Sequence, residues 1–178
     1  MPASPHDLFA LLDRLAIPHV TTWHEAVFTV AESASVKERI PGGHSKNLFL
    51  KDKKGRLFLV VAGADTPIDL KRLHETLGAA GRLSFGSADL LRATLGVEPG
   101  SVTPFAVMND VPATVDVTLD AALMAHADVN FHPLVNTATT TVARDDLVRF
   151  LTETNHPPRI LALPKPDGTG VSGDGAPS

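Results

Sequence analysis

Lys46 is the residue of this sequence with the clearest potential for chemistry. It begins the run Lys46-Asn-Leu-Phe-Leu-Lys51, whose apolar residues, followed by a glycine-containing turn and a second apolar run, predict a strand of a β-hairpin. Side chains alternate between the two faces of a strand, so Lys46 shares a face with Leu48 and Leu50, while Asn47 lies on the other. A lysine in register with leucines either extends its ammonium group to water or holds it in a cleft to meet an anion. Periodicity alone favours the first of these interpretations.

Basic side chains gather around this predicted strand. Residues 37–56 carry seven Lys or Arg and two acidic residues, a local charge of +5, whereas the other 158 residues sum to −9. A positive patch on an acidic protein suits a polyanion that is held at one place, such as the end of a nucleic acid. The alternative is that these charges only solvate the tip of a hairpin. The basic residues nearest the predicted turn are Lys51, Lys53, Lys54 and Arg56.

Two later segments could supply further binding groups. Gly100 and Pro104 bracket a short loop whose backbone N–H groups could cradle an anion, although the spacing by itself is a weak signal. His132 lies in the segment Asn130-Phe-His-Pro-Leu-Val-Asn136, where Pro133 restricts the backbone. Such a histidine either orients a substrate or makes an ordinary structural hydrogen bond.

Composition and motifs exclude several classes of function. The net charge of −4 excludes a globally basic nucleic-acid binder, and the absence of cysteine excludes disulfides, thiolate metal sites and a cysteine nucleophile. None of the eight histidines has the spacing of a metal-ligand motif such as H-E-x-x-H. His126 and His132, with Asp128 between them, are six positions apart. No serine-hydrolase elbow and no glycine-rich nucleotide-binding loop occur. Without a secretory signal or an apolar run long enough to span a membrane, the protein is expected to be cytoplasmic.

The helices and strands predicted from the sequence indicate one mixed α/β domain over residues 1–163, and this domain must position the residues named above. Residues 164–178 contain four Gly and three Pro and are predicted to be a disordered tail. Helix starts are predicted where a hydroxyl residue precedes an acid, at Ser4, Thr29, Thr66 and Ser87, and a last helix contains Leu147, Phe150 and Leu151. Strands are predicted at residues 18–22, 46–51, 56–61, 82–85, 103–108, 114–118, 128–131, 139–142 and 159–163.

Three segments together resemble the YbaK-like aminoacyl-tRNA editing family. They are Gly42-Gly-His-Ser-Lys-Asn-Leu-Phe-Leu50, Gly100-Ser-Val-Thr-Pro-Phe105 and Asn130-Phe-His-Pro-Leu-Val-Asn-Thr-Ala-Thr140, within a resemblance that spans residues 8–163. Within the family, the chain is most similar to the free-standing prolyl-tRNA editing proteins that clear mischarged alanine. The resemblance implies a curved mixed sheet surrounded by helices, and hydrolysis by water of the ester that joins a wrong amino acid to tRNA for proline.

The resemblance also implies roles for single residues and for partners. It implies no cofactor and no metal, the acceptor end of tRNA for proline as substrate, and a transient association with prolyl-tRNA synthetase. Editing of tRNA misacylated with cysteine or serine, or a non-catalytic nucleic-acid-binding module, are the alternatives. Lys46 is implied as the catalytic residue, and the substrate-binding residues are expected to be Asn47, Gly100, Pro104, His132 and Asn136. The positive patch predicts Lys51, Lys53, Lys54 and Arg56 as tRNA-binding residues.

Overall fold

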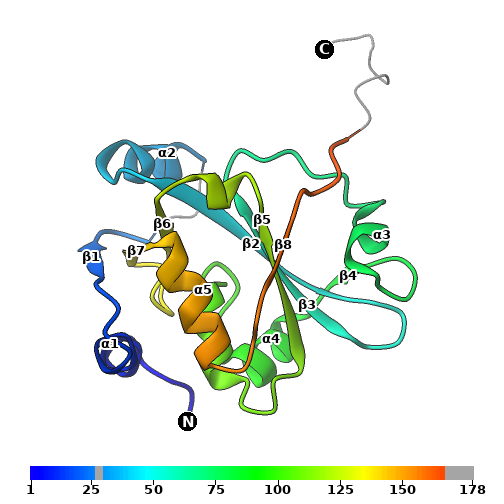
Figure 1. Ribbon diagram of the computed structural model, residues 1–178, viewed down its shortest axis with the longest axis horizontal. Helices are drawn as coiled ribbons and strands as arrows, with labels where there is room; N and C mark the ends of the chain where they lie inside the picture. The colour runs from blue at the N-terminus through cyan, green and yellow to red at the C-terminus, as the bar shows by residue number, and fades with distance from the viewer. Residues whose placement is uncertain (27–29, 167–178) are drawn as a thin grey trace, which may run out of the picture.

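A mixed sheet of eight strands forms the centre of the molecule. The computed structural model describes residues 1–26 and 30–166. Seven strands follow the order β1-β7-β6-β2-β3-β5-β8, and β4 pairs with β2 (Figure 1). The fold is therefore the mixed α/β domain that the sequence predicts. The strands are β1 (Val20–Trp23), β2 (Gly43–Lys51), β3 (Leu57–Gly63), β4 (Ser84–Phe85), β5 (Val115–Asp120), β6 (Asp128–Phe131), β7 (Ala138–Ala143) and β8 (Arg159–Leu161).

The predicted hairpin is the antiparallel pair β2–β3. Its turn is held by Asp52, whose Oδ1 accepts hydrogen bonds from the backbone N–H groups of Lys54 and Arg56, each at 2.9 Å. Gly55 completes the turn with a φ of +85°, a conformation that costs glycine little. Beyond the hairpin, β3 pairs in parallel with β5, and β2 pairs in parallel with β6. Parallel and antiparallel pairs thus occur in one sheet.

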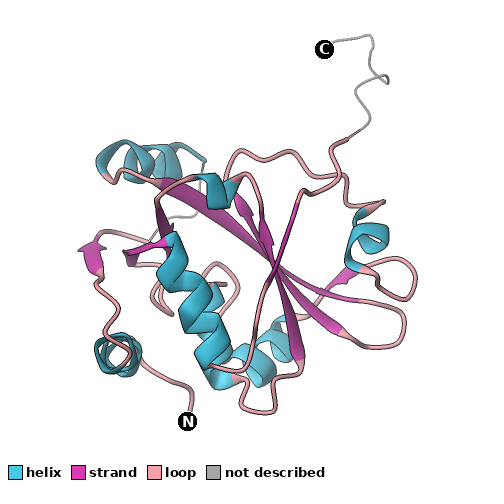
Figure 2. Ribbon diagram, in the orientation of Figure 1, coloured by secondary structure: helices cyan, strands magenta, loops and turns pink. Residues whose placement is uncertain are grey.

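Helices cover the two faces of the sheet unequally (Figures 1 and 2). On one face, buried residues of α1, α4 and α5 pack against Phe49, Leu59 and Val61. On the other, α3 packs against Leu50 and Phe58. The strand alternation predicted for β2 is confirmed, because Phe49 and Leu50 belong to the two different cores. The helices are α1 (Pro5–Arg14), α2 (Val30–Arg39), α3 (Leu73–Leu77), α4 (Ala88–Leu95), α5 (Arg144–Glu153) and the 3-10 turns η1 (Pro104–Asn109) and η2 (Leu123–Ala125).

Capping chemistry predicts two of the helix starts correctly. Ser4 and Asp7 form a reciprocal capping box at α1, and Ser87 accepts the N–H of Leu90 at the start of α4. The start predicted at Thr29 lies outside the described residues. The start predicted at Thr66 is wrong, since α3 begins only at Leu73.

The strand predicted at residues 103–108 is also wrong. This segment forms η1, in which Thr103 is the N-cap, accepting a hydrogen bond from the N–H of Phe105. Pro104 occupies the first helical position, where its missing N–H costs nothing. Local capping therefore decides the conformation of this apolar run, although its composition also suits a strand.

The C-terminal segment can be followed to residue 166. Most of the predicted tail, residues 167–178, lies outside the described residues. Before that point, the carbonyl of Pro164 accepts the N–H of Asp69 at 2.7 Å, and the carbonyl of Lys165 accepts from Arg72 at 2.6 Å. Across residues 1–26 and 30–166, no helix is both long and apolar enough to cross a membrane.

Candidate functional site

A pocket of about 210 Å³ opens beside the first half of β2. On the edge opposite β3, β2 pairs with β6 only at Gly43 and His44 and with β4 only at Leu50 and Lys51. The stretch between these pairs, which contains Lys46, has no strand beside it on this edge among the described residues. The pocket is lined by His24, Val36, Lys37, His44, Ser45, Lys46, Asn47, Gly100, Val102, Asn130, Phe131, His132 and Thr139.

Four residues predicted from the sequence therefore meet at one place. Lys46 and Asn47 come from β2, Gly100 from the loop before η1, and His132 from the segment after β6. They are up to 86 positions apart along the chain, from Lys46 to His132. The sheet order brings them together, because β6 lies next to β2.

The ammonium group of Lys46, in the first half of β2, is held by a backbone carbonyl. Its Nζ donates a hydrogen bond to the backbone carbonyl of Thr66 at 2.5 Å. Thr66 belongs to the loop that leaves β3, and Lys46 pairs with Ala62 on that strand. The lysine is thus fixed in a pocket, contrary to the solvated position that periodicity alone favours. An ammonium group has three donors, so two remain for a ligand.

His132 presents an unprotonated ring nitrogen. Its Nδ1 lies 3.1 Å from the carbonyl of Ala138, which only accepts, so Nδ1 carries the proton in the neutral ring. Burial lowers the pKa of His132, His24 lowers it further, and the bond to Ala138 opposes these effects, leaving the pKa below its ordinary value. Nε2 has no hydrogen-bond partner in the described part of the chain. His132 can therefore accept a hydrogen bond from a bound group.

His24 and Thr139 are site residues that the sequence does not reveal. His24 follows β1, and its Nδ1 lies 2.7 Å from the carbonyl of Glu25 while its Nε2 lies 2.8 Å from Oγ1 of Thr139. Since β1 pairs with β7, the two residues meet although they are 115 positions apart. No local motif marks either of them, so only the strand pairing identifies them.

Asn47 has one half of its amide satisfied. The hydroxyl of Ser45 donates a hydrogen bond to the carbonyl of Asn130 at 2.9 Å. The hydroxyl oxygen of Ser45 in turn accepts a hydrogen bond from Nδ2 of Asn47 at 3.4 Å. Oδ1 of Asn47 is buried without a hydrogen-bond partner among the described residues. An unpaired buried acceptor costs free energy, and such groups in native proteins often have a role in binding.

Three predicted residues stand in different relations to the pocket. Gly100 lines it with a φ of +92°, a conformation that favours glycine. Pro104 is buried at the start of η1 and does not line the pocket. Asn136 does not line it either, although its Nδ2 would lie 3.8 Å from a Cβ built on Gly100. Pro104 and Asn136 therefore lie outside this pocket, and Asn136 adjoins Gly100 at its wall.

The predicted tRNA-binding residues lie at the other end of β2. Lys51 is five residues from Lys46 along an extended strand, a span of roughly 16 Å. Arg56 is already engaged, since it donates to Asp116 at 2.7 Å and its guanidinium lies 5.0 Å from the centre of the Phe58 ring. The hairpin tip thus forms a basic surface separate from the pocket.

Electrostatically, the pocket combines a cation with neutral acceptors. Lys37 from α2 adds a second ammonium, 3.4 Å from the exposed carboxylate of Asp65. Among the described residues, no three His, Asp or Glu side chains are grouped so as to hold a metal ion. The site can therefore bind an anionic or ester-bearing group at Lys46 and orient a water molecule or an amine at the uncharged ring of His132.

Comparison with known proteins identifies the family. The model of the family described as aminoacyl-tRNA editing domain matches residues 24–150, which include Lys46, Gly100 and His132. The chain is 40% identical to prolyl-tRNA synthetase associated domain-containing protein 1 of Danio rerio over 159 residues, 88% of this chain and 86% of that protein. It is 39% identical to the prolyl-tRNA editing protein ProX of Acetoanaerobium sticklandii over 145 residues, 81% of this chain and 88% of that protein.

The fold is also found among solved structures. A crystal structure described as a candidate trans-editing enzyme for prolyl tRNA synthetase superposes with a TM-score of 0.69 at 18% identity. The superposition covers 93% of this chain and 99% of that one. At this identity the likeness concerns the fold alone.

Proposed function

Because this chain belongs to the aminoacyl-tRNA editing domain family, we propose that it hydrolyses alanine from tRNA for proline that has been charged in error. An aminoacyl-tRNA deacylase is the activity that an editing domain provides, and the name of the ProX relative points to tRNA for proline. The proposed editing domain comprises residues 1–163. The observation that carries the proposal is the meeting of Lys46, Asn47, Gly100 and His132 in one small pocket.

The proposed reaction needs no group that this pocket lacks. An aminoacyl ester is an activated acyl group, so orienting a water molecule and the carbonyl can supply much of the rate. In our proposal, the oxygen of water bonds to the carbonyl carbon, the ester bond breaks, and the ribose oxygen leaves with a proton. Lys46 binds the terminal nucleotide, and backbone N–H groups near Gly100 face the developing oxyanion.

His132 has an orienting role in this proposal. Its unprotonated Nε2 accepts a hydrogen bond from the attacking water or from the amino group of the substrate. Oδ1 of Asn47 is a second acceptor, which a ligand donor can reach when the protein atoms that bury it move aside. Both residues line the pocket, and neither carries a positive charge in the neutral state described above.

The size of the pocket supports a small amino acid. Pockets for drug-sized ligands measure roughly 300–1,000 Å³, whereas this one measures about 210 Å³. It suits an aminoacyl end such as alanine, with the nucleotide at its mouth, and a bulkier or rigid side chain is excluded by contact with its walls.

A deacylation panel tests the proposal. Purified protein is incubated with tRNA for proline carrying alanine, serine, cysteine or proline, and release of the amino acid is measured. We expect fast release of alanine, no release of proline, and a loss of most of the rate in Lys46→Ala. Lys71→Ala is the matched control, because Lys71 is an exposed lysine outside both the pocket and the basic segment 37–56.

The same panel separates the alternatives. Faster release of serine or cysteine would replace alanine as the proposed substrate. Salt-dependent binding of tRNA with no turnover of any ester would identify a non-catalytic nucleic-acid-binding module. An unchanged rate in Lys46→Ala would remove that residue from its catalytic role.

Two further parts of the proposal concern context. An enzyme that acts on aminoacylated tRNA works where translation takes place, so we place the protein in the cytoplasm. The Danio rerio relative is named for an association with prolyl-tRNA synthetase, and we propose a transient association of this chain with that enzyme. Chemical cross-linking of the two purified proteins, with and without tRNA for proline, tests the association.

A further inference from the structure

We propose that Thr66 and Asp120 are positioning residues that hold the ammonium group of Lys46 in the orientation needed for substrate binding. The inference rests on the proposed function for its role in editing. The contact on which it depends is independent of that function. It gives a function to the end of β5 and to residues 64–66, the start of the loop that leaves β3.

The first step is the bond between Lys46 and Thr66. Nζ of Lys46 donates to the backbone carbonyl of Thr66 at 2.5 Å. A lysine side chain has four rotatable carbon–carbon bonds, and a single fixed acceptor at its tip removes most of its freedom. Any movement of the Thr66 carbonyl must therefore move the ammonium group or release it.

The second step is the bond that fixes Thr66 itself. Its hydroxyl donates to Oδ2 of Asp120 at 2.7 Å, and the N–H of Gly63 donates to the same oxygen at 3.0 Å. Oδ1 of Asp120 accepts the N–H of Ala122 at 3.0 Å. Asp120 is 2% exposed, so the carboxylate is a buried anchor whose oxygens are both hydrogen-bonded. It fixes the loop at the residue that holds the lysine.

Sheet topology explains why these residues meet. β3 and β5 run in parallel, so their carboxyl-terminal residues, Gly63 and Asp120, lie at the same end of the sheet. β2 runs antiparallel to β3, so β2 begins at that same end of the sheet, and Lys46 lies in its first half. The N–H of Ala64 donates to the carbonyl of His44 at 2.8 Å, which ties the loop to the start of β2.

Gly63 makes this close approach sterically feasible. A Cβ at this position would lie 2.7 Å from Oγ1 of Thr66, too close for any real side chain. The loop can therefore turn back and place Thr66 against Asp120 only because position 63 has no side chain. The same hydroxyl explains why the helix start predicted at Thr66 does not form, since it bonds to Asp120 rather than to a helix N-terminus.

The test uses Thr66→Val, which removes the hydroxyl and keeps the shape of the side chain. We expect kcat/KM for alanyl-tRNA to fall at least tenfold in Thr66→Val and in Asp120→Asn, and Thr66→Ser to restore it to within about twofold of wild type. Thr118→Val is the matched control: Thr118 is buried on β5, two residues from Asp120, and its hydroxyl has no hydrogen-bond partner among the described residues. It should leave kcat/KM unchanged. Thermal unfolding of each variant shows whether it is folded at the assay temperature.

Two further measurements separate positioning from a general structural effect. In a Lys46→Ala background, Thr66→Val should cause no additional loss of activity, because the two residues act through one contact. In the free protein, the amine of Lys46 should react at least threefold faster with acetic anhydride in Thr66→Val than in wild type, as measured by peptide mass spectrometry.

The outcomes distinguish this inference from the proposed function. If Lys46→Ala keeps the full rate, the catalytic role of Lys46 fails, and the labelling experiment still decides whether Thr66 holds it. If Lys46→Ala is inactive but Thr66→Val has wild-type activity and wild-type labelling, the positioning role is overturned. The positioning role would also be overturned if Thr66→Val lowered activity further in the Lys46→Ala background, by the same factor as in the wild type.

Discussion

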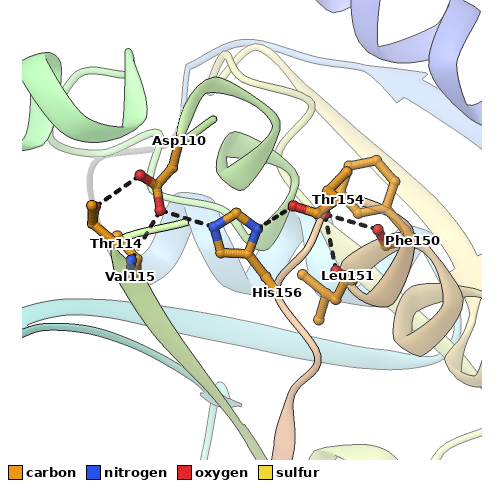
Figure 3. A network of polar contacts seen from close by, with 7 residues as sticks. All are labelled: Asp110, Thr114, Val115, Phe150, Leu151, Thr154 and His156. Atoms are coloured by element: carbon orange, nitrogen blue, oxygen red, sulfur yellow. Dashed lines mark hydrogen bonds and ion pairs between the residues drawn. The ribbon is translucent and has the colours of Figure 1, made fainter. Parts of the chain in front are cut away.

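Asp110 and His156 form a buried pair that joins the end of η1 to the segment after α5 (Figure 3). Nε2 of His156 lies 2.8 Å from Oδ2 of Asp110, and Nδ1 lies 2.6 Å from the carbonyl of Thr154. Both ring nitrogens therefore lie within hydrogen-bond distance of an oxygen, so the ring is held from both sides. Burial raises the pKa of Asp110, but hydrogen bonds from His156, Thr114 and Val115 outweigh it and leave the pKa below its ordinary value.

Removing one partner of this pair should destabilise the protein strongly. Asp110→Asn replaces a carboxylate oxygen that accepts hydrogen bonds with an amide group that donates. This leaves buried donors unpaired, and each unpaired group costs about 1–3 kcal/mol. Urea unfolding measures the difference. Asp116→Asn is the control, since Asp116 pairs with Arg56 at the surface, where an ion pair contributes at most about 1 kcal/mol. Equal effects of the two substitutions would contradict a special role for the buried pair.

The activity should have an acid limb set by His132. Because burial and His24 lower the pKa of His132, its ring stays neutral down to a pH below about 6.5, the ordinary value for histidine. If the neutral Nε2 is required, kcat/KM falls only as the pH drops through this lowered pKa. The pH profile of kcat/KM measures the midpoint.

Two variants assign this limb. His132→Gln cannot titrate and should remove it, whereas His19→Gln should leave it in place, because His19 lies beside Asp13 and Phe9, away from the pocket. A limb that persists in His132→Gln, or whose midpoint lies above 6.5, would show that another group titrates.

Gly100→Ala should reduce activity more than its effect on stability explains. A Cβ at Gly100 has room, with its nearest neighbour 3.8 Å away, so the substitution introduces only the strain of a positive φ, about 1–2 kcal/mol. Gly55→Ala has the same strain in the hairpin turn, also with room for a Cβ. We expect similar losses of stability in urea, and a tenfold or larger loss of kcat/KM only for Gly100→Ala. Equal activity of the two variants would separate Gly100 from the site.

The hairpin tip should affect binding of the tRNA body but not the chemistry. For the double variant Lys53→Gln, Lys54→Gln we expect a higher KM for alanyl-tRNA, with the salt dependence of log(kcat/KM) reduced by about one unit of slope for each lost phosphate contact. A substrate reduced to the aminoacylated terminal nucleotides should be cleaved as by wild type, because the tip is remote from the pocket. Lys71→Gln should change neither. A variant with an unchanged salt slope would mean that these lysines only solvate the hairpin.

Local patterns predict much of the fold. The alternation in β2 and the turn residues of the hairpin act between neighbours in the chain, and so does the capping of α1 and α4, so the structure confirms them. The segment 103–108 fails as a strand because Thr103 and Pro104 start a 3-10 turn. Another failure occurs where a distant residue competes for a local group. Thr66 can cap a helix by its type, but Asp120, 54 positions away, takes its hydroxyl.

By itself, the sequence determined the class of fold, the absence of thiol chemistry and, through ordered motifs, four residues of the pocket. Only the tertiary structure decided that Lys46 is held by Thr66 instead of extending to water, that His24 and Thr139 belong to the site, and that the hairpin lysines lie apart from it. The physical reason is that strand pairing and burial set which groups meet and which lose water. These are properties of residues that contact each other across the sheet, and no stretch of neighbouring residues contains them.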